Sequence, residues 1–391
     1  MKQLCDDLAS YGHKVTIFTS FPHYDSDRIW ERYRGKVWLR ERLGNLDVFR
    51  LYIYVPKQKN WIVGRILNYA SWNMLSTMGG ILAGKQDIVF VPSPPLTNGI
   101  AGFAISRIRR VPFVYNVQDI YPDVAVRLGI LKNARIINTF RSLERFTYSK
   151  AAAVSVISEN FKCNLIRKGV PEDKLFVIPN FVDPEFIRPL PRHNRLSAAQ
   201  GLHDYYIVLF AGNIGLSQGL EQVLETANIL KGHPEIYFLI VGNGATKRSL
   251  ISTAQRLRLR NVRFLPFLPH NDVPELYASS DVCLVPLKRG LTEESVPSKV
   301  YSILAAAKPL IASVDKDSDT WRLVKDADCG ICIPPEDPKA LADAILNLHR
   351  DRSRGLRMGE NGRKFVESRF SRQRIAKEYE RLFISVVSGE R

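Results

Sequence analysis

The sequence is poor in features that mark secreted, disulfide-bonded or membrane-spanning chains. It has five cysteines in 391 residues, an odd number that fits a reducing compartment. Cys329 and Cys332 have CxxC spacing without a second CxxC or a His pair, which favours reduced core thiols over a metal or redox site. The longest apolar window, residues 61–83, is interrupted by Arg65 and by paired glycines, so we expect no transmembrane helix. The acids in the opening MKQLCDDLASYGHK argue against a signal peptide.

Acidic residues are also scarce relative to basic ones, which gives a net charge of +17 and a pI of about 9.7. The densest basic stretch, residues 28–65, is also aromatic. No zinc-finger spacing, basic heptad helix or RNP-like strand accompanies this charge, so nucleic acid is not expected as a partner. An anionic membrane surface or a phosphorylated substrate fits better. The helix expected at residues 61–82 has two interpretations, a core helix with aromatic packing, which is favoured, or an interfacial surface that touches a membrane.

Strands that alternate with helices divide the chain into two halves. A segment rich in Pro, Arg and His follows the first half, and strand–helix alternation restarts at residue 207. This pattern predicts an α/β protein with two Rossmann-like parallel-sheet domains facing a cleft. We expect the first domain at residues 1–183, a linker at 184–205, the second domain at 206–370 and a last helix at 371–391.

The most informative stretch is residues 292–309, TEESVPSKVYSILAAAKP, which is typical of a loop followed by a short buried helix. Pro297 and Ser298 favour the first turn of a helix, whose free N–H groups and positive dipole end suit a phosphate. Lys299 would add a full positive charge there, and Glu294 could accept hydrogen bonds from hydroxyl groups. The stretch therefore suits a phosphorylated, hydroxyl-rich ligand, although taken alone it is more typical of an ordinary helix start with a surface lysine.

Three further segments stand at the carboxyl ends of expected strands, where open α/β sheets bind ligands. The loop AGNIGLSQG follows the strand at residues 207–210, and GNG follows the strand at residues 236–241. Their glycines allow backbone N–H groups to approach a phosphate closely, although the GxxG pattern alone is weak. In the first half, Asp119 follows the strand at residues 112–117 and is a candidate functional carboxylate, whereas Asp123 better suits a helix cap.

Other patterns are weaker. Asp315, Asp317 and Asp319 resemble an Asp-x-Asp metal motif, but their very polar turn favours a solvated loop. The histidines have no metal-ligand spacing, and no GxSxG nucleophile elbow is present. We therefore expect no metal site.

Several longer segments occur in an order that resembles a known family. They are GHKVTIFTSFP, NVQDIYPDVAVRLG, AAAVSVISEN, VIPNFVD, LFAGNIGLSQGLEQVLETA, FLIVGNG, VRFLPFLP, VPELYASSDVCLVPL and VPSKVYSILAAAKPLIAS. The chain resembles glycosyltransferase family 4, and within it the bacterial branch that builds O-antigen, colanic-acid-like and capsular polysaccharides. The resemblance implies the GT-B fold, with an acceptor domain, a nucleotide-sugar domain and a last helix that crosses back to the first domain. It also implies a retaining, metal-independent transfer in which the nucleotide-sugar is a substrate and no cofactor is used.

The resemblance assigns roles by position. Glu294 matches the first Glu of the family's Glu-x7-Glu motif, which holds the transferred sugar, and Asp119 lies where the family has a His or Asp near the reacting carbon. The second Glu, on the ribose, falls on Ser302. Asn213 and Gln218 replace the Arg and Lys that often bind the diphosphate, so we hypothesise that Lys299 and its helix start supply that charge. The donor-binding candidates are Gly212, Asn213, Gly215, Gln218, Gly242, Gly244, Pro297, Ser298 and Ser302, and the catalytic candidates are Asp119, Glu294 and Lys299.

The front of the chain departs from the family, which begins with a strand and a Gly-Gly loop before the helix that comes first here. About 20 residues would supply that strand and loop, and a mis-set start codon is the favoured explanation.

The expected function is transfer of a sugar from a nucleotide-sugar, UDP favoured over GDP, to a lipid-linked saccharide. We expect the protein to be cytoplasmic, with peripheral contact to an anionic inner-membrane surface. The alternatives are a nucleotide-sugar epimerase of the same fold, which would release a sugar isomer, and a truncated, non-catalytic nucleotide- or sugar-binding protein, which would bind without turnover.

Overall fold

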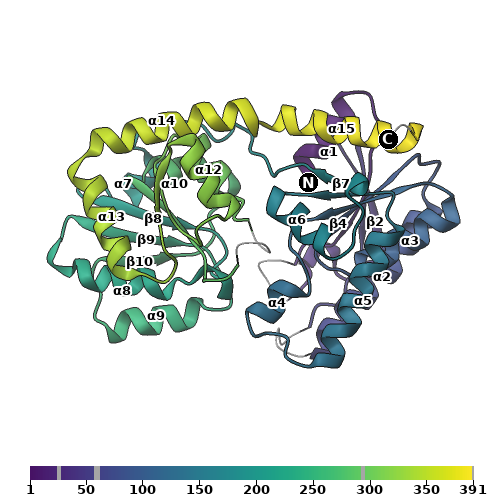
Figure 1. Ribbon diagram of the computed structural model, residues 1–391, viewed down its shortest axis with the longest axis horizontal. Coiled ribbons are helices and arrows are strands. Elements are labelled where there is room, and N and C mark those ends of the chain that lie inside the picture. The colour runs from purple at the N-terminus through teal and green to yellow at the C-terminus, as the bar shows by residue number, and fades with distance from the viewer. Residues whose placement is uncertain (24–27, 57–61, 292–295, 390–391) are drawn as a thin grey trace. The chain divides into compact units, whose positions relative to one another are not determined.

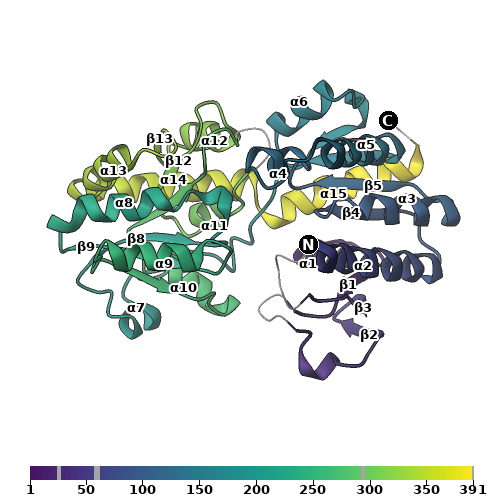
Figure 2. The ribbon, with the colours of Figure 1, turned by 90° about the horizontal axis from the view of Figure 1, so that it is seen from below.

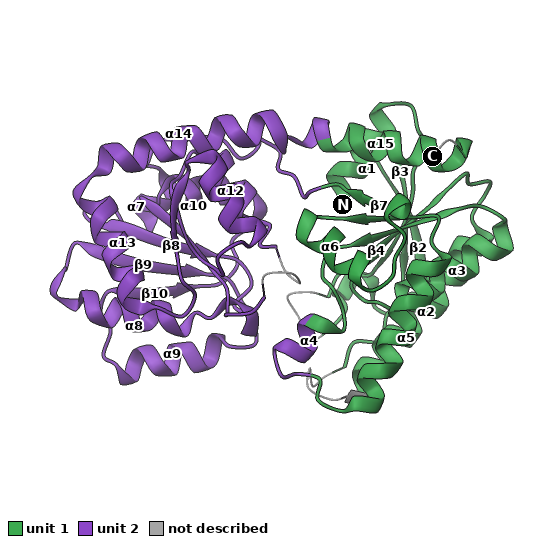
Figure 3. Cartoon of the chain, viewed as in Figure 1, with its two compact units in different colours: residues 1–123, 131–178, 375–391 green, residues 124–130, 179–374 purple. Residues whose placement is uncertain are grey.

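The computed structural model describes residues 1–23, 28–56, 62–291 and 296–389 and divides into two compact units (Figure 3). Unit 1 comprises Met1–Asp123, Leu131–Ile178 and Ile375–Arg391, and unit 2 comprises Val124–Ile130 and Pro179–Arg374. Each unit contains a parallel sheet whose strands are joined through helices (Figure 1), so the predicted pair of α/β domains is confirmed.

Unit 1 contains two sheets. The first has the order β1-β3-β2, with β2 antiparallel to β3, and the second has the order β4-β5-β6-β7 and is parallel throughout. β5 is buried along its whole length, as expected for a strand covered on both faces. The strands are β1 (Thr16–Ser20), β2 (Trp38–Leu43), β3 (Leu46–Leu51), β4 (Val89–Ser93), β5 (Phe113–Val117), β6 (Ala153–Val156) and β7 (Leu175–Val177).

The helices of unit 1 cover these sheets separately. The first two helices lie against the three-stranded sheet (Figure 2), and α3 packs on β4 and β5. The helices are α1 (Lys2–Ser10), α2 (Ile62–Leu82), α3 (Asn98–Arg109), α5 (Ala134–Lys150) and α6 (Glu159–Arg167), while α4 (Asp123–Arg127) begins at the last residue before the chain enters unit 2.

The chain returns to unit 1 in its last helix, α15 (Arg372–Ser388). Tyr379 on this helix packs edge-on against Phe90 of β4, with ring centroids 5.4 Å apart. Its hydroxyl accepts a hydrogen bond of 3.0 Å from Asn116, whose amide also donates to Ser155 in β6. The helix therefore completes a buried polar network in the middle of the four-stranded sheet.

Unit 2 is built on one parallel sheet of order β10-β9-β8-β11-β12-β13. Alternate residues of β8 enter different cores, since Ile207 and Leu209 belong to one hydrophobic cluster and Val208 and Phe210 to the other. Both faces of the sheet are thus covered. The strands are β8 (Tyr206–Ala211), β9 (Ile236–Val241), β10 (Val262–Leu265), β11 (Val282–Pro286), β12 (Leu310–Ser313) and β13 (Gly330–Ile333).

Three of the helices of unit 2, α7, α12 and α14, were not expected from sequence. Residues 184–205 include a short helix, α7, and α14 follows α13 after a single residue, Asp351, whose side chain accepts from the Arg354 N–H. The helices are α7 (Arg195–Ala199), α8 (Glu221–Ile229), α9 (Lys247–Arg256), α10 (Val273–Ala278), α11 (Lys299–Ala305), α12 (Asp319–Ala327), α13 (Pro338–Arg350) and α14 (Arg352–Arg369). Within the described ranges, no helix combines the length and apolarity needed to cross a membrane.

Candidate functional site

The strand order of unit 2 places a switch point beside β8. From β8 the chain moves through β9 to β10 on one side, and it later resumes on the other side with β11. In open α/β sheets, ligands bind outside the carboxyl ends of the strands at such a point, because the loops on either side diverge there. The loops that follow β8, β9 and β11 carry the described donor-binding candidates except Ser302, which lies on α11.

The loops after β8 and β9 are joined by backbone hydrogen bonds. The Gly212 N–H donates to Val241 O over 3.0 Å, the Ile214 N–H to Asn243 O over 2.8 Å, and the Thr246 N–H to Ile214 O over 3.1 Å. The Thr246 hydroxyl donates to the same Ile214 carbonyl over 2.9 Å. The two loops therefore form one rigid structure rather than two independent turns.

Glycine is required where these loops cross. Gly242 has φ +146° and Gly244 has φ +159°, in the region that side chains rarely adopt. A Cβ on Gly242 would overlap the carbonyl oxygen of Gly212, and one on Gly244 would overlap that of Ile214. Gly215 differs from them, because its ideal Cβ position lies 2.8 Å from the flexible side-chain amide of Asn213 and not from a backbone atom. Gly242 and Gly244 therefore allow two loop backbones to touch at the sheet edge.

The two joined loops after β8 and β9 are called the cradle below. Lys299, in the first turn of α11, extends into this cradle from the other side of the switch point. Its Nζ donates to Gln218 Oε1 over 2.7 Å and lies 3.6 Å from the centroid of the Phe210 ring. A Cβ at Gly212 would lie 3.2 Å from the same Nζ, so the ammonium is beside the glycine loop. Within the described ranges, Lys299 makes no ion pair with a carboxylate. Burial against these neutral groups lowers the pKa of Lys299 to about 7.

Sequence reasoning missed Lys247 at the start of α9. Its ammonium donates to Gly242 O over 2.6 Å, to Leu265 O over 2.9 Å and to Asn243 Oδ1 over 3.0 Å. It therefore fixes the loop after β9 from outside the cradle, and partial burial lowers its pKa. The sequence feature that could have indicated this role is the position of Lys247, five residues after Gly242.

The remaining candidates of unit 2 lie on or beside α11. Ser298 is exposed at the N-cap position without a side-chain cap, and Pro297 is buried directly before it. Ser302 is partly buried one turn after Lys299, where its hydroxyl shares a hydrogen bond with Tyr277. Glu294 lies outside the described residues.

Asp119 belongs to unit 1, where it follows β5. The preceding Gln118 donates to the Asn116 side chain over 2.8 Å, which anchors this loop to the buried network under α15. Partial burial raises the pKa of Asp119 to about 6, because few polar groups replace the water around its carboxylate. A carboxyl group of this kind can change protonation state near neutral pH.

The possible metal motifs have structural roles. The Asp315 carboxylate accepts from the Gly290 N–H over 2.7 Å, and Ser318 caps α12, which Asp319 begins. Cys329 and Cys332 are free thiols. Throughout the part of the chain that the structure describes, no group of three His, Cys, Asp or Glu side chains could hold a metal ion.

The cradle has the chemistry of an anion site. One ammonium without a carboxylate partner among the described residues faces two glycine loops whose backbones can approach a ligand closely. A low local dielectric strengthens the attraction between such an ammonium and a phosphate group.

Comparison with known proteins shows the family of the chain. Residues 194–365 match the family model "Glycosyl transferases group 1", and residues 1–180 match "Glycosyl transferase 4-like domain". The putative colanic acid biosynthesis glycosyl transferase WcaI of Escherichia coli (strain K12) is 28% identical over 361 residues, which cover 88% of this chain and 86% of WcaI.

Solved structures share the fold. Sucrose-phosphate synthase from Thermosynechococcus elongatus superposes with a TM-score of 0.76 at 19% identity, over 100% of this chain and 93% of the other. HepE from Anabaena, solved with UDP-glucose, superposes with a TM-score of 0.69 at 18% identity, over 87% and 86%. With both halves matched, the chain belongs to the glycosyltransferases that combine a 4-like first domain with a group 1 second domain, and it is a transferase enzyme of the GT-B fold.

Proposed function

We propose that this glycosyltransferase moves a sugar from a nucleotide-sugar, UDP favoured over GDP, to a lipid-linked saccharide during assembly of a cell-surface polysaccharide. The transfer retains the anomeric configuration, needs no metal and takes place at the cytoplasmic face of the inner membrane. The observation that carries the proposal is Lys299, whose ammonium lies 2.7 Å from Gln218 Oε1 beside the glycine loops.

Lys299 has the position and charge to stabilise a leaving diphosphate. Negative charge grows on the phosphate oxygens as the sugar–phosphate bond breaks, and a preorganised ammonium in a buried site favours that charge without reorganisation. The glycine loops let backbone N–H groups add to this stabilisation. Lys247 acts as a positioning residue, because it holds three acceptors of the loop after β9.

The other roles follow the family resemblance. We assign Glu294 to the hydroxyls of the transferred sugar and Asp119 to the region of the reacting carbon, while a donor phosphate oxygen takes the acceptor's proton. Pro297, Ser298 and Ser302 are assigned to the nucleotide side of the site. The UDP-glucose in HepE and the colanic acid assignment of WcaI support a UDP-sugar donor and a polysaccharide product.

Nucleotide binding tests the donor assignment directly. UDP and GDP would each be added in the presence of a chelator, with thermal unfolding as the measurement. A nucleotide at about 100 times its Kd stabilises a protein by about 2.7 kcal/mol, so the preferred base should raise the unfolding temperature by several degrees. Equal shifts with UDP and GDP would contradict the base preference, and a shift that appears only with Mg²⁺ would contradict metal independence. No shift with either nucleotide would overturn the donor site.

Asp119 gives a prediction for pH dependence. If its carboxylate is needed, kcat/KM should fall about tenfold per pH unit below about pH 6, where the group becomes protonated. The Asp119→Asn variant should lose this limb and most of its activity. It should also unfold at a higher temperature than the natural chain at pH 7.5. The pKa of Asp119 is higher in the folded than in the unfolded protein, so the stability that its protonated form contributes is lost as pH rises from about 4 to about 6. Asn does not ionise and therefore does not lose this stability.

The control is Asp173→Asn, an exposed carboxylate of unit 1 in the Glu172–Lys174 turn, which should keep both the pH profile and the unfolding temperature. An unchanged acid limb in Asp119→Asn would remove this residue from the reaction.

A further inference from the structure

A second lysine of unit 2, Lys288, lies against the glycine loop that follows β8. Its N–H donates to Ser217 O over 2.9 Å, which joins the loop after β11 to the loop after β8. A Cβ on Gly219 would lie 3.3 Å from Lys288 Cγ, so the lysine stem passes beside this glycine. Gln218, the residue before Gly219, accepts from the Lys299 ammonium. Two lysines therefore lie beside neighbouring residues of one loop.

The charge of Lys288 is not compensated within the part of the chain that the structure describes. Its side chain is partly buried, and its ammonium has no ion pair or hydrogen bond among the described residues. Glu221, in the first turn of α8, is exposed and does not pair with it. Arg289, the next residue along the chain, differs, because its guanidinium donates to Pro335 O over 3.1 Å and lies 3.9 Å from a Glu336 carboxylate oxygen. Lys288 can therefore bind a ligand without losing an existing contact.

A buried hydrogen-bond donor lies at the same place. Gln222 is only 4% exposed, and the Ser313 hydroxyl donates to its Oε1 over 2.8 Å, which fixes the orientation of the carboxamide. Its Nε2 has no acceptor among the described residues and lies 3.6 Å from the ideal Cβ position of Gly219. A buried N–H group without an acceptor costs free energy, so an oxygen supplied by a ligand would stabilise this arrangement.

Helix α8 adds a third contribution. It begins at Glu221, two residues after Gly219, so its first N–H groups and its positive dipole end lie at this turn. Its N-cap residue, Leu220, supplies no side-chain cap. A cation beside a helix N-terminus is unfavourable by itself, because both carry charge of the same sign. An anion placed between them interacts favourably with both.

We propose that Lys288, Gln222 Nε2 and the start of α8 form a second phosphate subsite, which binds one phosphate of the nucleotide-sugar while Lys299 binds the other. Each phosphate of such a diphosphate diester carries one negative charge, so two separate ammonium groups compensate both charges. Movement of the flexible Lys288 stem, which lies at the same Gly219 position, opens Nε2 to the phosphate oxygen. This inference rests on the proposed function, because the donor supplies the two linked phosphates.

Pyrophosphate and inorganic phosphate test the two subsites without a nucleotide. Titration calorimetry of the full chain with a chelator, at about pH 6.5 and thus below the Lys299 pKa of about 7, would measure both affinities. Pyrophosphate spans both subsites and should bind about 10–100-fold more tightly than phosphate, because a second charge-assisted contact is added. Lys288→Met should remove most of this preference and Gln222→Leu a smaller part of it. Lys288→Arg, which keeps the charge, should retain it.

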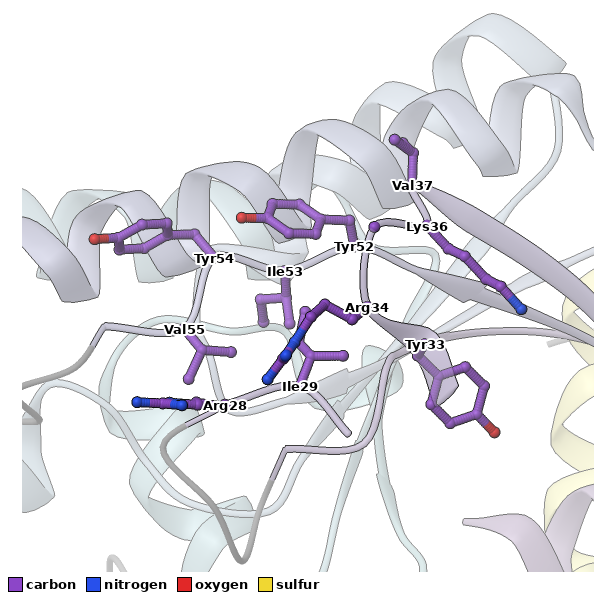
Figure 4. A pocket seen from close by; sticks show the side chains of 11 residues that line it. Arg28, Ile29, Tyr33, Arg34, Lys36, Val37, Tyr52, Ile53, Tyr54 and Val55 are labelled. Carbon is purple, nitrogen blue, oxygen red and sulfur yellow. The ribbon is translucent and has the colours of Figure 1, made fainter. Parts of the chain in front are cut away.

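Lys36→Met is the matched control. Lys36 is an exposed lysine of unit 1 at the edge of a pocket of about 610 Å³, which residues within 28–37 and 52–55 line (Figure 4). Its replacement removes the same charge and should change neither the affinities nor the unfolding temperature. Lys288→Met should also keep the unfolding temperature, since its ammonium loses no contact with a described residue. Equal losses of affinity in both lysine variants would overturn the subsite, because only net charge would then act.

UDP-glucose binding, measured in parallel, separates this inference from the proposed function. Lys288→Met should weaken UDP-glucose binding by about 10–100-fold. Unchanged affinities for pyrophosphate and UDP-glucose in Lys288→Met would refute only the second subsite. Pyrophosphate binding that depends on Lys288, without any binding of UDP-glucose, would support the subsite and refute only the proposed donor.

Discussion

Replacing Lys299 with methionine is expected to lower turnover by about 10²–10³-fold and to weaken UDP-glucose binding strongly. Methionine preserves the length and apolar packing over Phe210 but removes the charge that faces the glycine loops. The loss should therefore appear in binding and kcat rather than in folding. Titration calorimetry with UDP-glucose and steady-state rates would measure it, and Lys299→Ala should behave in the same way.

The effect should also depend on pH in a defined direction. Burial sets the pKa of Lys299 in the free enzyme at about 7, and a bound diphosphate raises it by favouring the ammonium. Affinity for UDP-glucose should therefore fall up to about tenfold per pH unit above about pH 7. UDP-glucose suits this test because its diphosphate diester does not titrate in that range. Lys299→Met should show no such slope.

Lys308→Met supplies the control. Lys308 is also a partly buried lysine of unit 2 with a lowered pKa, but its ammonium donates to Ala278 O and Ser280 O, each over 2.8 Å. Its replacement should cost stability and leave donor affinity unchanged. Near-normal turnover in Lys299→Met, or equal loss of affinity in both variants, would refute the role of Lys299.

Gly242→Ala is expected to abolish donor binding and to destabilise unit 2 by about 3–5 kcal/mol. The added methyl group would overlap the Gly212 carbonyl at a φ of +146°, so both loops of the cradle would have to separate. The hydrogen bonds that join the loops would be strained at the same time. Denaturant unfolding and UDP-glucose titration would measure the two losses.

Gly232→Ala is the matched control, because a Cβ there meets nothing within 4 Å and the residue belongs to the same unit. It should be neutral in both measurements. If Gly242→Ala bound the donor normally, the contact between the two glycine loops would not be needed for the site.

Much of unit 2 was predictable because its parallel strands are continuous apolar runs that end in glycine or proline. The loop after β8, the loop after β9 and the short helix that begins at Lys299 were all located from such punctuation. The close contact between Gly242 and Gly212 was not predictable, because it depends on the register between the neighbouring strands β8 and β9. Single-chain patterns do not contain that information.

Side-chain partners that are distant in sequence were also beyond prediction. Phe210 was expected only as the last residue of the strand at residues 207–210, yet its ring lies 3.6 Å from the Lys299 ammonium. Lys247 was expected only as part of a basic helix, because nothing local shows that three acceptors surround its amine. Helix α14 was missed because it contains three glycines, which usually oppose helix formation. Gly359 and Gly362 allow close packing there, since a Cβ at either would meet the α11–β12 segment.

The late return of the chain to unit 1 affects biogenesis. Ile375 and the residues after it leave the ribosome only when all of unit 2 has already been synthesised. During synthesis the four-stranded sheet therefore lacks Tyr379, the hydrogen-bond partner of Asn116, while unit 2 can complete its folding first. The half that is translated first is thus the half that finishes folding last, which reverses the usual order. Loss of the last helix, through a nonsense codon or a protease, would therefore destabilise unit 1, most of which is encoded at the opposite end of the gene.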